Sequence, residues 1–134
     1  MKEEKYHELC KKLMDKIFGA EHTTIMPYSV LVEVVASVKR CTDSEELAEN
    51  ADNNLQNTPL VYFLELTKER ALEASDIAKE TGLKGMDSIV VQIAKENNSI
   101  LITLDNEIIN RVGKIANAVN IEIFDAMDAK NKDE

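Results

Sequence analysis

Two short apolar runs, LVYFLEL at residues 60–66 and SILITL at residues 99–104, restrict the folds that this chain can adopt. Both are rich in β-branched or aromatic residues, which is typical of strands buried in a parallel sheet. The segments around them carry apolar residues at intervals of three and four, as amphipathic helices do. Strands that alternate with helices predict an α/β fold around a parallel sheet.

The element boundaries follow from periodicity, capping residues and chain breaks. Helices are expected at residues 3–18, 29–39, 43–57, 68–80, 87–97 and 105–117, and strands at residues 23–26, 60–66, 99–104 and 119–124. Ser29 is predicted to cap the second helix, Thr42 and Glu45 to form a capping box for the third, and Thr67 to cap the fourth. Residues 1–124 are expected to form a single domain, followed by a charged, disordered tail at 125–134.

Charge and composition argue against several classes of function. The formal net charge is −9 at pH 7, which disfavours strong non-specific nucleic-acid binding through phosphate neutralisation. No apolar run approaches the roughly 18 residues of a membrane span. The N-terminal sequence MKEEKYHELC lacks the apolar core of a signal peptide, so a cytoplasmic location without membrane association is expected. The two cysteines, Cys10 and Cys41, are expected to be reduced thiols.

Glu33 is an acidic residue in an otherwise apolar helical segment that runs from Val30 to Val38. Helical geometry leaves it few polar surroundings, and burial of an unpaired carboxylate is costly. A buried Glu33 therefore needs a cation, a partner or a proton. The alternative is that Glu33 pairs with an arginine or lies at the edge of the helix.

Asp87 and Asp105 flank the run at 99–104, the first at the start of the preceding helix and the second at the carboxyl end of the strand. Open α/β sheets bind their ligands at the carboxyl ends of strands. Thr103 lies two residues before Asp105, on the same side of the strand, and its hydroxyl can orient a carboxylate or a water molecule. The alternative for each aspartate is a simple helix cap.

Taken together, Glu33, Asp87 and Asp105 predict a cation site at one edge of the sheet. Carboxylates gathered in one place raise one another's pKa and destabilise the fold unless a cation binds. Ligand sets made only of oxygen suit Mg²⁺ or Mn²⁺. Zinc is disfavoured, because His7 and His22 are isolated and the chain has no Cys-x-x-Cys motif.

The segments PYSVLVEVVASVKR (27–40) and GLKGMDSIVVQIAKENNSILITLDNEI (82–108) resemble PIN-domain ribonucleases, in particular the toxin-type, VapC-like proteins of toxin–antitoxin pairs. The resemblance implies a three-layer α/β/α fold with a central, mainly parallel sheet. It implies an endoribonuclease that uses Mg²⁺ or Mn²⁺ to activate water for the hydrolysis of RNA phosphodiester bonds. It also implies an antitoxin protein as a partner.

Carried onto this sequence, the family pattern makes Glu33, Asp87 and Asp105 the metal ligands and catalytic residues, with Thr103 as the supporting catalytic hydroxyl. The chain departs from the pattern at its start, because family members open with an apolar strand that ends in a further aspartate. No such strand precedes Tyr6, so the first strand is expected to be missing, either because the start is misplaced and a strand lies upstream or because the chain is a degenerate relative. Without this strand, backbone hydrogen-bonding groups would be left unpaired inside the sheet, which is costly. We therefore expect a homodimer, a strand supplied by a partner, or closure of the gap by the neighbouring strands.

The missing aspartate leaves a second class of function open, a catalytically degenerate PIN-like module that binds protein or RNA through sheet edges and helix faces. For an active enzyme, the basic pairs Lys68/Arg70 and Lys39/Arg40 are candidates for RNA contact. A phosphoacceptor domain is a third alternative. It is disfavoured because Glu65, rather than an aspartate, follows the apolar core of LVYFLEL.

Overall fold

The computed structural model describes residues 2–132, which form two compact units. The inserted unit is the continuous segment Lys16–Leu66. The flanking unit combines residues 2–15 with residues 67–132. Helix α1, Lys2–Phe18, agrees with the predicted helix at 3–18 and runs from the flanking unit into the inserted unit.

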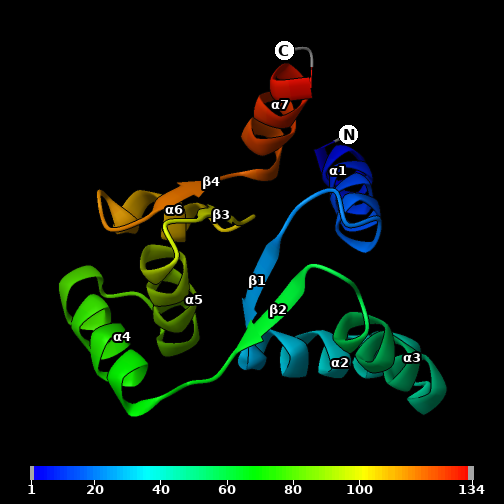
Figure 1. Ribbon diagram of the computed structural model, residues 1–134, viewed down its shortest axis with the longest axis horizontal. Helices are drawn as coiled ribbons and strands as arrows, with labels where there is room; N and C mark the ends of the chain where they lie inside the picture. Colours follow the sequence, from blue (N-terminus) through cyan, green and yellow to red (C-terminus); the bar gives the residue numbers. More distant parts are fainter. Residues whose placement is uncertain (1, 133–134) are drawn as a thin grey trace. The chain divides into compact units, whose positions relative to one another are not determined.

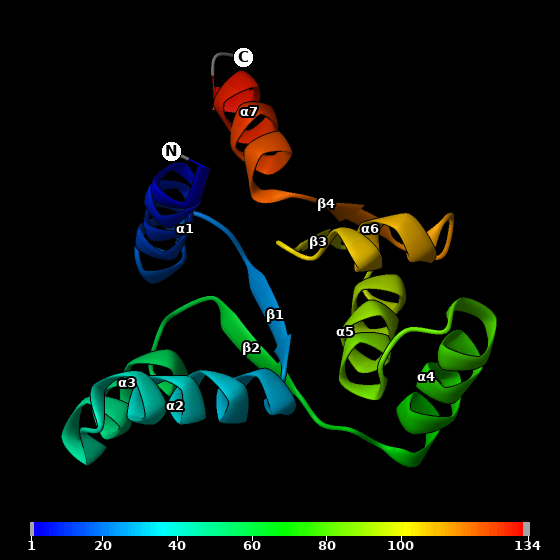
Figure 2. The same ribbon diagram turned by 180° about the vertical axis from the view of Figure 1, so that it is seen from behind.

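The inserted unit is a pair of parallel strands connected by two helices (Figure 1). Its elements are β1 (Thr24–Pro27), α2 (Tyr28–Thr42), α3 (Glu45–Gln56) and β2 (Val61–Leu64). Thr24 of β1 lies opposite Val61 of β2. Helices α2 and α3 pack side by side, as both views show (Figures 1 and 2). The ring of Tyr28 stacks on Phe63 with 5.4 Å between centroids, so the start of α2 is fixed against β2.

Two predicted caps in the inserted unit are wrong. Helix α2 begins directly after Pro27, whose φ of −69° leads into a helix, and Ser29 is therefore the second helical residue instead of the cap. Thr42 still belongs to α2, where its hydroxyl donates to the carbonyl of Val38 at 2.6 Å. The cap of α3 is Ser44, whose Oγ accepts the N–H of Leu47.

The flanking unit contains most of the helices and a second pair of parallel strands. Its elements after α1 are α4 (Lys68–Thr81), α5 (Gly85–Glu96), β3 (Ile100–Ile102), α6 (Asn106–Val112), β4 (Asn117–Val119) and α7 (Ile121–Lys132). Ile100 of β3 lies opposite Asn117 of β4. Thr67 caps α4, as predicted, by accepting the N–H of Arg70.

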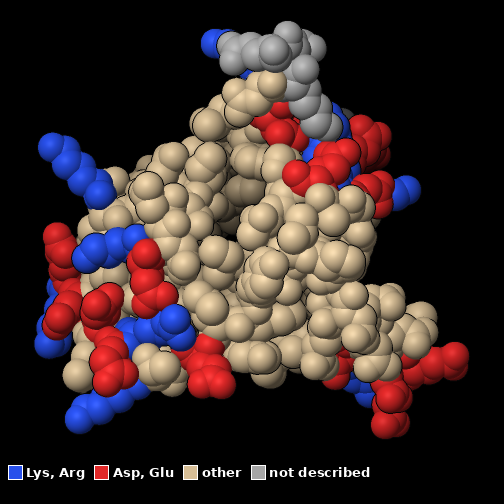
Figure 3. Space-filling view, viewed as in Figure 1, with Lys and Arg blue, Asp and Glu red and all other residues tan. Residues whose placement is uncertain are grey.

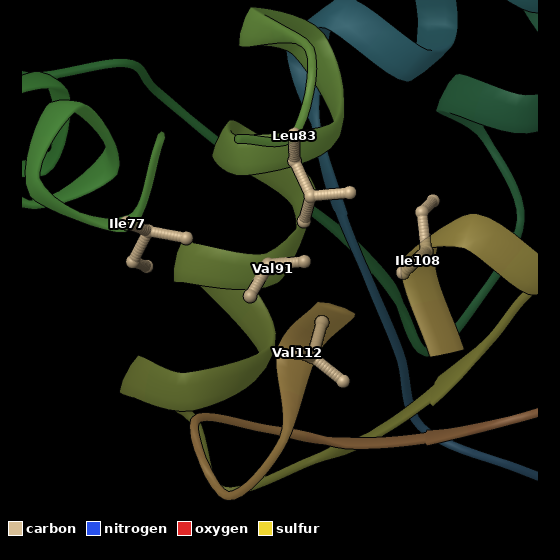
Figure 4. Packing of buried hydrophobic residues seen from close by; sticks show 5 residues of the cluster. All are labelled: Ile77, Leu83, Val91, Ile108 and Val112. Atoms are coloured by element: carbon tan, nitrogen blue, oxygen red, sulfur yellow. The ribbon is translucent and has the colours of Figure 1, made fainter. Parts of the chain in front are cut away.

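Helices α4, α5 and α6 of the flanking unit share an apolar core (Figure 4). Its buried residues are Ile77, Leu83, Val91, Ile108 and Val112. Partly buried apolar residues of β3, of β4 and of the turn before β4 pack against this core, namely Leu101, Ile115, Ala116 and Ala118. Apolar burial stabilises a fold by about 25 cal/mol per Å². The core therefore holds the starts of α5 and α6, which carry two of the predicted site residues, on one rigid framework.

The C-terminal segment differs from the prediction of a strand at 119–124 followed by a disordered tail. The strand β4 ends at Val119, and Asn120 starts α7 by accepting the N–H of Ile123 on its Oδ1 at 2.8 Å. Ile121 is buried, so the apparent alternation of VNIEIF is instead one turn of an amphipathic helix. Residues 133–134 of the predicted tail lie outside the described part of the chain.

Ion pairs attach α7 to the N-terminal helix. Lys12 of α1 lies 2.8 Å from Asp125, and Lys5 lies 3.6 Å from Glu122. The Asp125 carboxylate accepts a hydrogen bond from Lys12 and raises the pKa of its ammonium group. The two ends of the described chain are thus joined through charged side chains.

The parallel direction of the strands and the α/β character of the chain confirm the predicted fold class at this level. The described strands form two separate two-stranded ladders, β1–β2 and β3–β4. The three-layer arrangement and the single domain over residues 1–124 stay predictions. Within residues 2–132, no helix combines the length and the apolar character that crossing a bilayer requires.

Truncation of Ile77 to alanine is expected to lower the free energy of unfolding by about 2–5 kcal/mol, because it leaves a cavity between α4 and α5. Leu72 lies on the same helix but is 58% exposed, so Leu72→Ala should change stability by less than about 0.5 kcal/mol. Urea unfolding of both variants measures the difference. Equal effects of the two substitutions would contradict the described core.

Candidate functional site

Thr103 and Asp105 are brought together by a tight turn at the end of β3. The backbone N–H of Asp105 donates to Thr103 Oγ1 at 3.0 Å. Asp105 Oδ1 in turn accepts the N–H of Glu107 at 2.9 Å and so caps α6. The capping alternative is therefore confirmed for Asp105, but it uses only one carboxylate oxygen. Oδ2 has no hydrogen-bond partner among the described residues and stays available to a ligand.

Asp87 does not cap α5. The helix begins at Gly85, its cap position is Lys84, and no side chain there accepts a hydrogen bond from the first turn. Asp87 lies inside the first turn, where its negative charge is favoured by the positive end of the helix. It is half-buried and makes no hydrogen bond or ion pair with any described residue. The capping alternative for this aspartate is wrong, and both of its oxygens are available.

Glu33 lies in the middle of α2 on an exposed face, next to Val32, which is 65% exposed. The expectation that Glu33 is buried is wrong, because no residue of α2 is fully buried. The apolar character of the segment is spread around a helix that packs mainly on α3. Of the two alternatives, the helix edge is the correct one, since no arginine pairs with Glu33 in the described part of the chain.

The predicted site residues thus divide between the two units. Asp87, Thr103 and Asp105 lie in the flanking unit, and Glu33 lies in the inserted unit. Thr103 and Asp105 are in direct contact. The convergence of Glu33, Asp87 and Asp105 on one ion stays a prediction.

The donor atoms of these residues fit Mg²⁺ or Mn²⁺. The available groups are carboxylate oxygens, which both ions prefer. No described lysine or arginine neutralises Glu33, Asp87 or Asp105. Other acidic side chains form ion pairs with basic side chains. Asp43 lies 2.9 Å from Lys39, and Glu107 lies 3.2 Å from Arg111.

Two of the basic residues predicted to contact RNA, Arg70 and Lys39, are paired with acids of the chain. The Arg70 guanidinium donates to both carboxylate oxygens of Glu96, with Nη2 3.0 Å from Oε2. Lys39 is paired with Asp43 within α2 and its cap. In Figure 3, acidic and basic side chains lie side by side over α4, so this face carries no patch of a single sign. Lys68 and Arg40 stay candidates.

A polar network around Gln92, which sequence periodicity did not reveal, joins α4 to α5. The Gln92 side chain is 1% exposed, and its Nε2 donates to Glu73 at 3.1 Å and to Glu96 at 3.3 Å. The Arg70 guanidinium beside Glu96 holds the pKa of that carboxyl below its ordinary value of 4.5. The sequence signal of this network is a polar residue, Gln92, inside the apolar pattern of α5.

The network predicts a pH-dependent contribution to stability. Because the folded-state pKa of Glu96 is lowered, its stabilising effect is complete above about pH 4.5 and is lost as the pH falls through the folded-state value. The stability difference between the wild type and Glu96→Gln should therefore shrink as the pH falls below about 4.5. Thermal unfolding between pH 3 and pH 7 measures it, with Glu80→Gln, an exposed acid on α4, as the control. A difference that stays constant with pH would contradict the assignment.

A family model described as "PIN domain" matches residues 1–115. The matched range covers more than half of the chain and contains Glu33, Asp87, Thr103 and Asp105. No match was found among curated proteins.

Proposed function

The chain belongs to the PIN-domain family of nucleases, and on this premise we propose that it is a metal-dependent endoribonuclease that hydrolyses RNA phosphodiester bonds. The observation that carries the proposal is the family match over residues 1–115, which contains all the predicted site residues. The uncompensated carboxylates of Glu33, Asp87 and Asp105 support it further.

Glu33, Asp87 and Asp105 are proposed to hold one or two Mg²⁺ or Mn²⁺ ions. Each offers at least one carboxylate oxygen that no described residue occupies. When bound, the ion supplies Lewis-acid charge that activates water and stabilises the leaving oxygen. Bound cations also reverse the local sign of the field, which reconciles a net charge of −9 with a polyanionic substrate.

The residues of the chain itself supply orientation. Asp105 is fixed at both ends, because its backbone N–H is bonded to Thr103 and its Oδ1 to the N–H of Glu107. A carboxylate held in this way presents its free oxygen in one direction at little cost in conformational entropy. Thr103 accepts a hydrogen bond, so its hydroxyl hydrogen is free to donate to a neighbouring oxygen. We assign it the supporting role.

We also propose that the enzyme is the toxin of a toxin–antitoxin pair, acts in the cytoplasm and forms a homodimer. Support for protein partners comes from large apolar side chains exposed in the inserted unit, among them Tyr62 at 53% and Leu66 at 56%. Light scattering coupled to size exclusion is expected to give twice the monomer mass of 15.0 kDa. A folded monomer at micromolar concentration would contradict the dimer and leave the nuclease proposal intact.

Cleavage of a labelled single-stranded RNA tests the proposed activity. Cutting is expected in Mn²⁺, and EDTA should abolish it. Asp87→Asn should reduce the rate by roughly a hundredfold or more, because loss of a ligand removes several kcal/mol of transition-state stabilisation. Asp76→Asn, which changes an exposed aspartate paired with Lys79 on α4, is the matched control and should cut like the wild type.

Two outcomes of this assay would overturn the proposal. Cutting that resists EDTA and Asp87→Asn would exclude the metal site. A folded protein that neither cuts RNA nor binds Mn²⁺ at millimolar concentration would favour the catalytically degenerate interaction module.

A further inference from the structure

Ser29, in the first turn of α2, has a hydroxyl that the fold does not use. Its Oγ is buried and has no hydrogen-bond partner among the described residues. Buried hydroxyls nearly always form a hydrogen bond. One without a partner therefore either lowers the stability of the fold or has a function. Ser29 does not cap the helix, because α2 begins before it, at Tyr28. The hydroxyl therefore has no local structural role in the described chain.

Glu33 follows Ser29 by four residues in the same helix. Side chains at positions i and i+4 lie on the same face, with about 5–6 Å between their Cβ atoms. Long side chains in a helix lean toward its N-terminus, over the turn that contains residues i−3 and i−4. This general preference places the turn that contains Ser29 on the side toward which a helical Glu33 side chain extends. Glu33 also has no hydrogen-bond or ion-pair partner in the described part of the chain.

We propose that Ser29 is a positioning residue for Glu33, whose carboxylate accepts a hydrogen bond from the Ser29 hydroxyl while its other oxygen faces the cation. The inference rests on the proposed function, because it assigns Glu33 as a metal ligand. Ligating carboxylates are commonly held by a second hydrogen-bond donor, and loss of such a donor weakens metal binding about 10- to 100-fold. The Ser29 hydroxyl has no hydrogen bond in the absence of the ion. It can therefore bond to Glu33 on metal binding at little cost in free energy, since no existing hydrogen bond must break.

Ser37 provides a matched comparison on the same helix. It also lies four residues from Glu33, but on the C-terminal side, away from the direction in which the glutamate leans. Ser37 is exposed, so its hydroxyl is open to solvent and needs no partner from the protein. A role for hydroxyl groups in general would involve both serines, whereas the positioning role involves Ser29 alone.

Calorimetric titration with Mn²⁺, together with thermal unfolding of the metal-free protein, tests the proposal on the full chain. Ser29→Ala should weaken Mn²⁺ binding about tenfold or more and leave the unfolding temperature of the metal-free protein unchanged or higher. Ser29→Thr keeps the hydroxyl and should bind within about threefold of the wild type. Ser29→Cys keeps the size but donates weakly, so it should resemble Ser29→Ala and replaces it if the alanine variant does not fold. Ser37→Ala should bind like the wild type.

Three results would overturn the inference. If Ser29→Ala binds Mn²⁺ like the wild type while Glu33→Gln does not, the metal site stands and the positioning role fails. If Ser29→Ala destabilises the metal-free protein and Ser29→Thr fails to restore Mn²⁺ binding, the serine is structural. If Glu33→Gln binds Mn²⁺ as tightly as the wild type, the proposed metal site fails and this inference fails with it.

Discussion

Val91 of α5 lies between α4 and α6 with no exposed surface, and the apolar contact around it organises the flanking unit. Asp87 precedes Val91 by four residues, which is about one helical turn, so its place is set by the same helix that fills the core. Asp105 caps α6, whose Ile108 and Val112 reach the same core. The two aspartates are thus attached to one apolar framework. A rigid framework of this kind lets charged groups sit in the first turns of helices without relying on flexible loops.

Some acidic side chains of the chain are paired with basic ones, and others have no described partner. Glu96 is held by Arg70 and Gln92 at the end of α5, whereas Asp87 at the other end of this helix has no described partner. The ion pair at one end fixes the α4–α5 contact, and the uncompensated acid at the other end can bind a cation. A formal net charge of −9 fits this arrangement, because acids without paired bases are in excess. This division supports a cation-dependent function over direct electrostatic capture of RNA.

Sequence patterns predicted most elements, because local signals agreed with the tertiary environment. Thr67 caps α4 as its position indicates, and the apolar runs give parallel strands. The failures have physical causes. The alternation at 119–124 does not form a strand, because Asn120 starts a helix there, and periodicity over six residues does not distinguish a strand from a helix. The apolar segment around Glu33 predicts burial, but Glu33 is exposed because α2 packs on α3 with only part of its surface.

The candidate site could be named from sequence mainly through the family resemblance, since each acid alone had an ordinary alternative. Asp105 does cap a helix, but this is compatible with a functional role, because capping uses only Oδ1 and leaves Oδ2 available to a ligand. For Asp87 it proved wrong. Glu33 lies in a different unit from the two aspartates, and local sequence patterns do not predict a pairing between distant parts of the chain.

The central claim is that Glu33, Asp87 and Asp105 bind the same cation, and paramagnetic broadening by Mn²⁺ in an amide NMR spectrum tests it most directly. The amide signals of residues around 33, 87 and 105 are expected to broaden together at the same low ratio of Mn²⁺ to protein, while that of exposed Asp76 on α4 stays sharp. Broadening around residues 87 and 105 with residue 33 unaffected would contradict the claim.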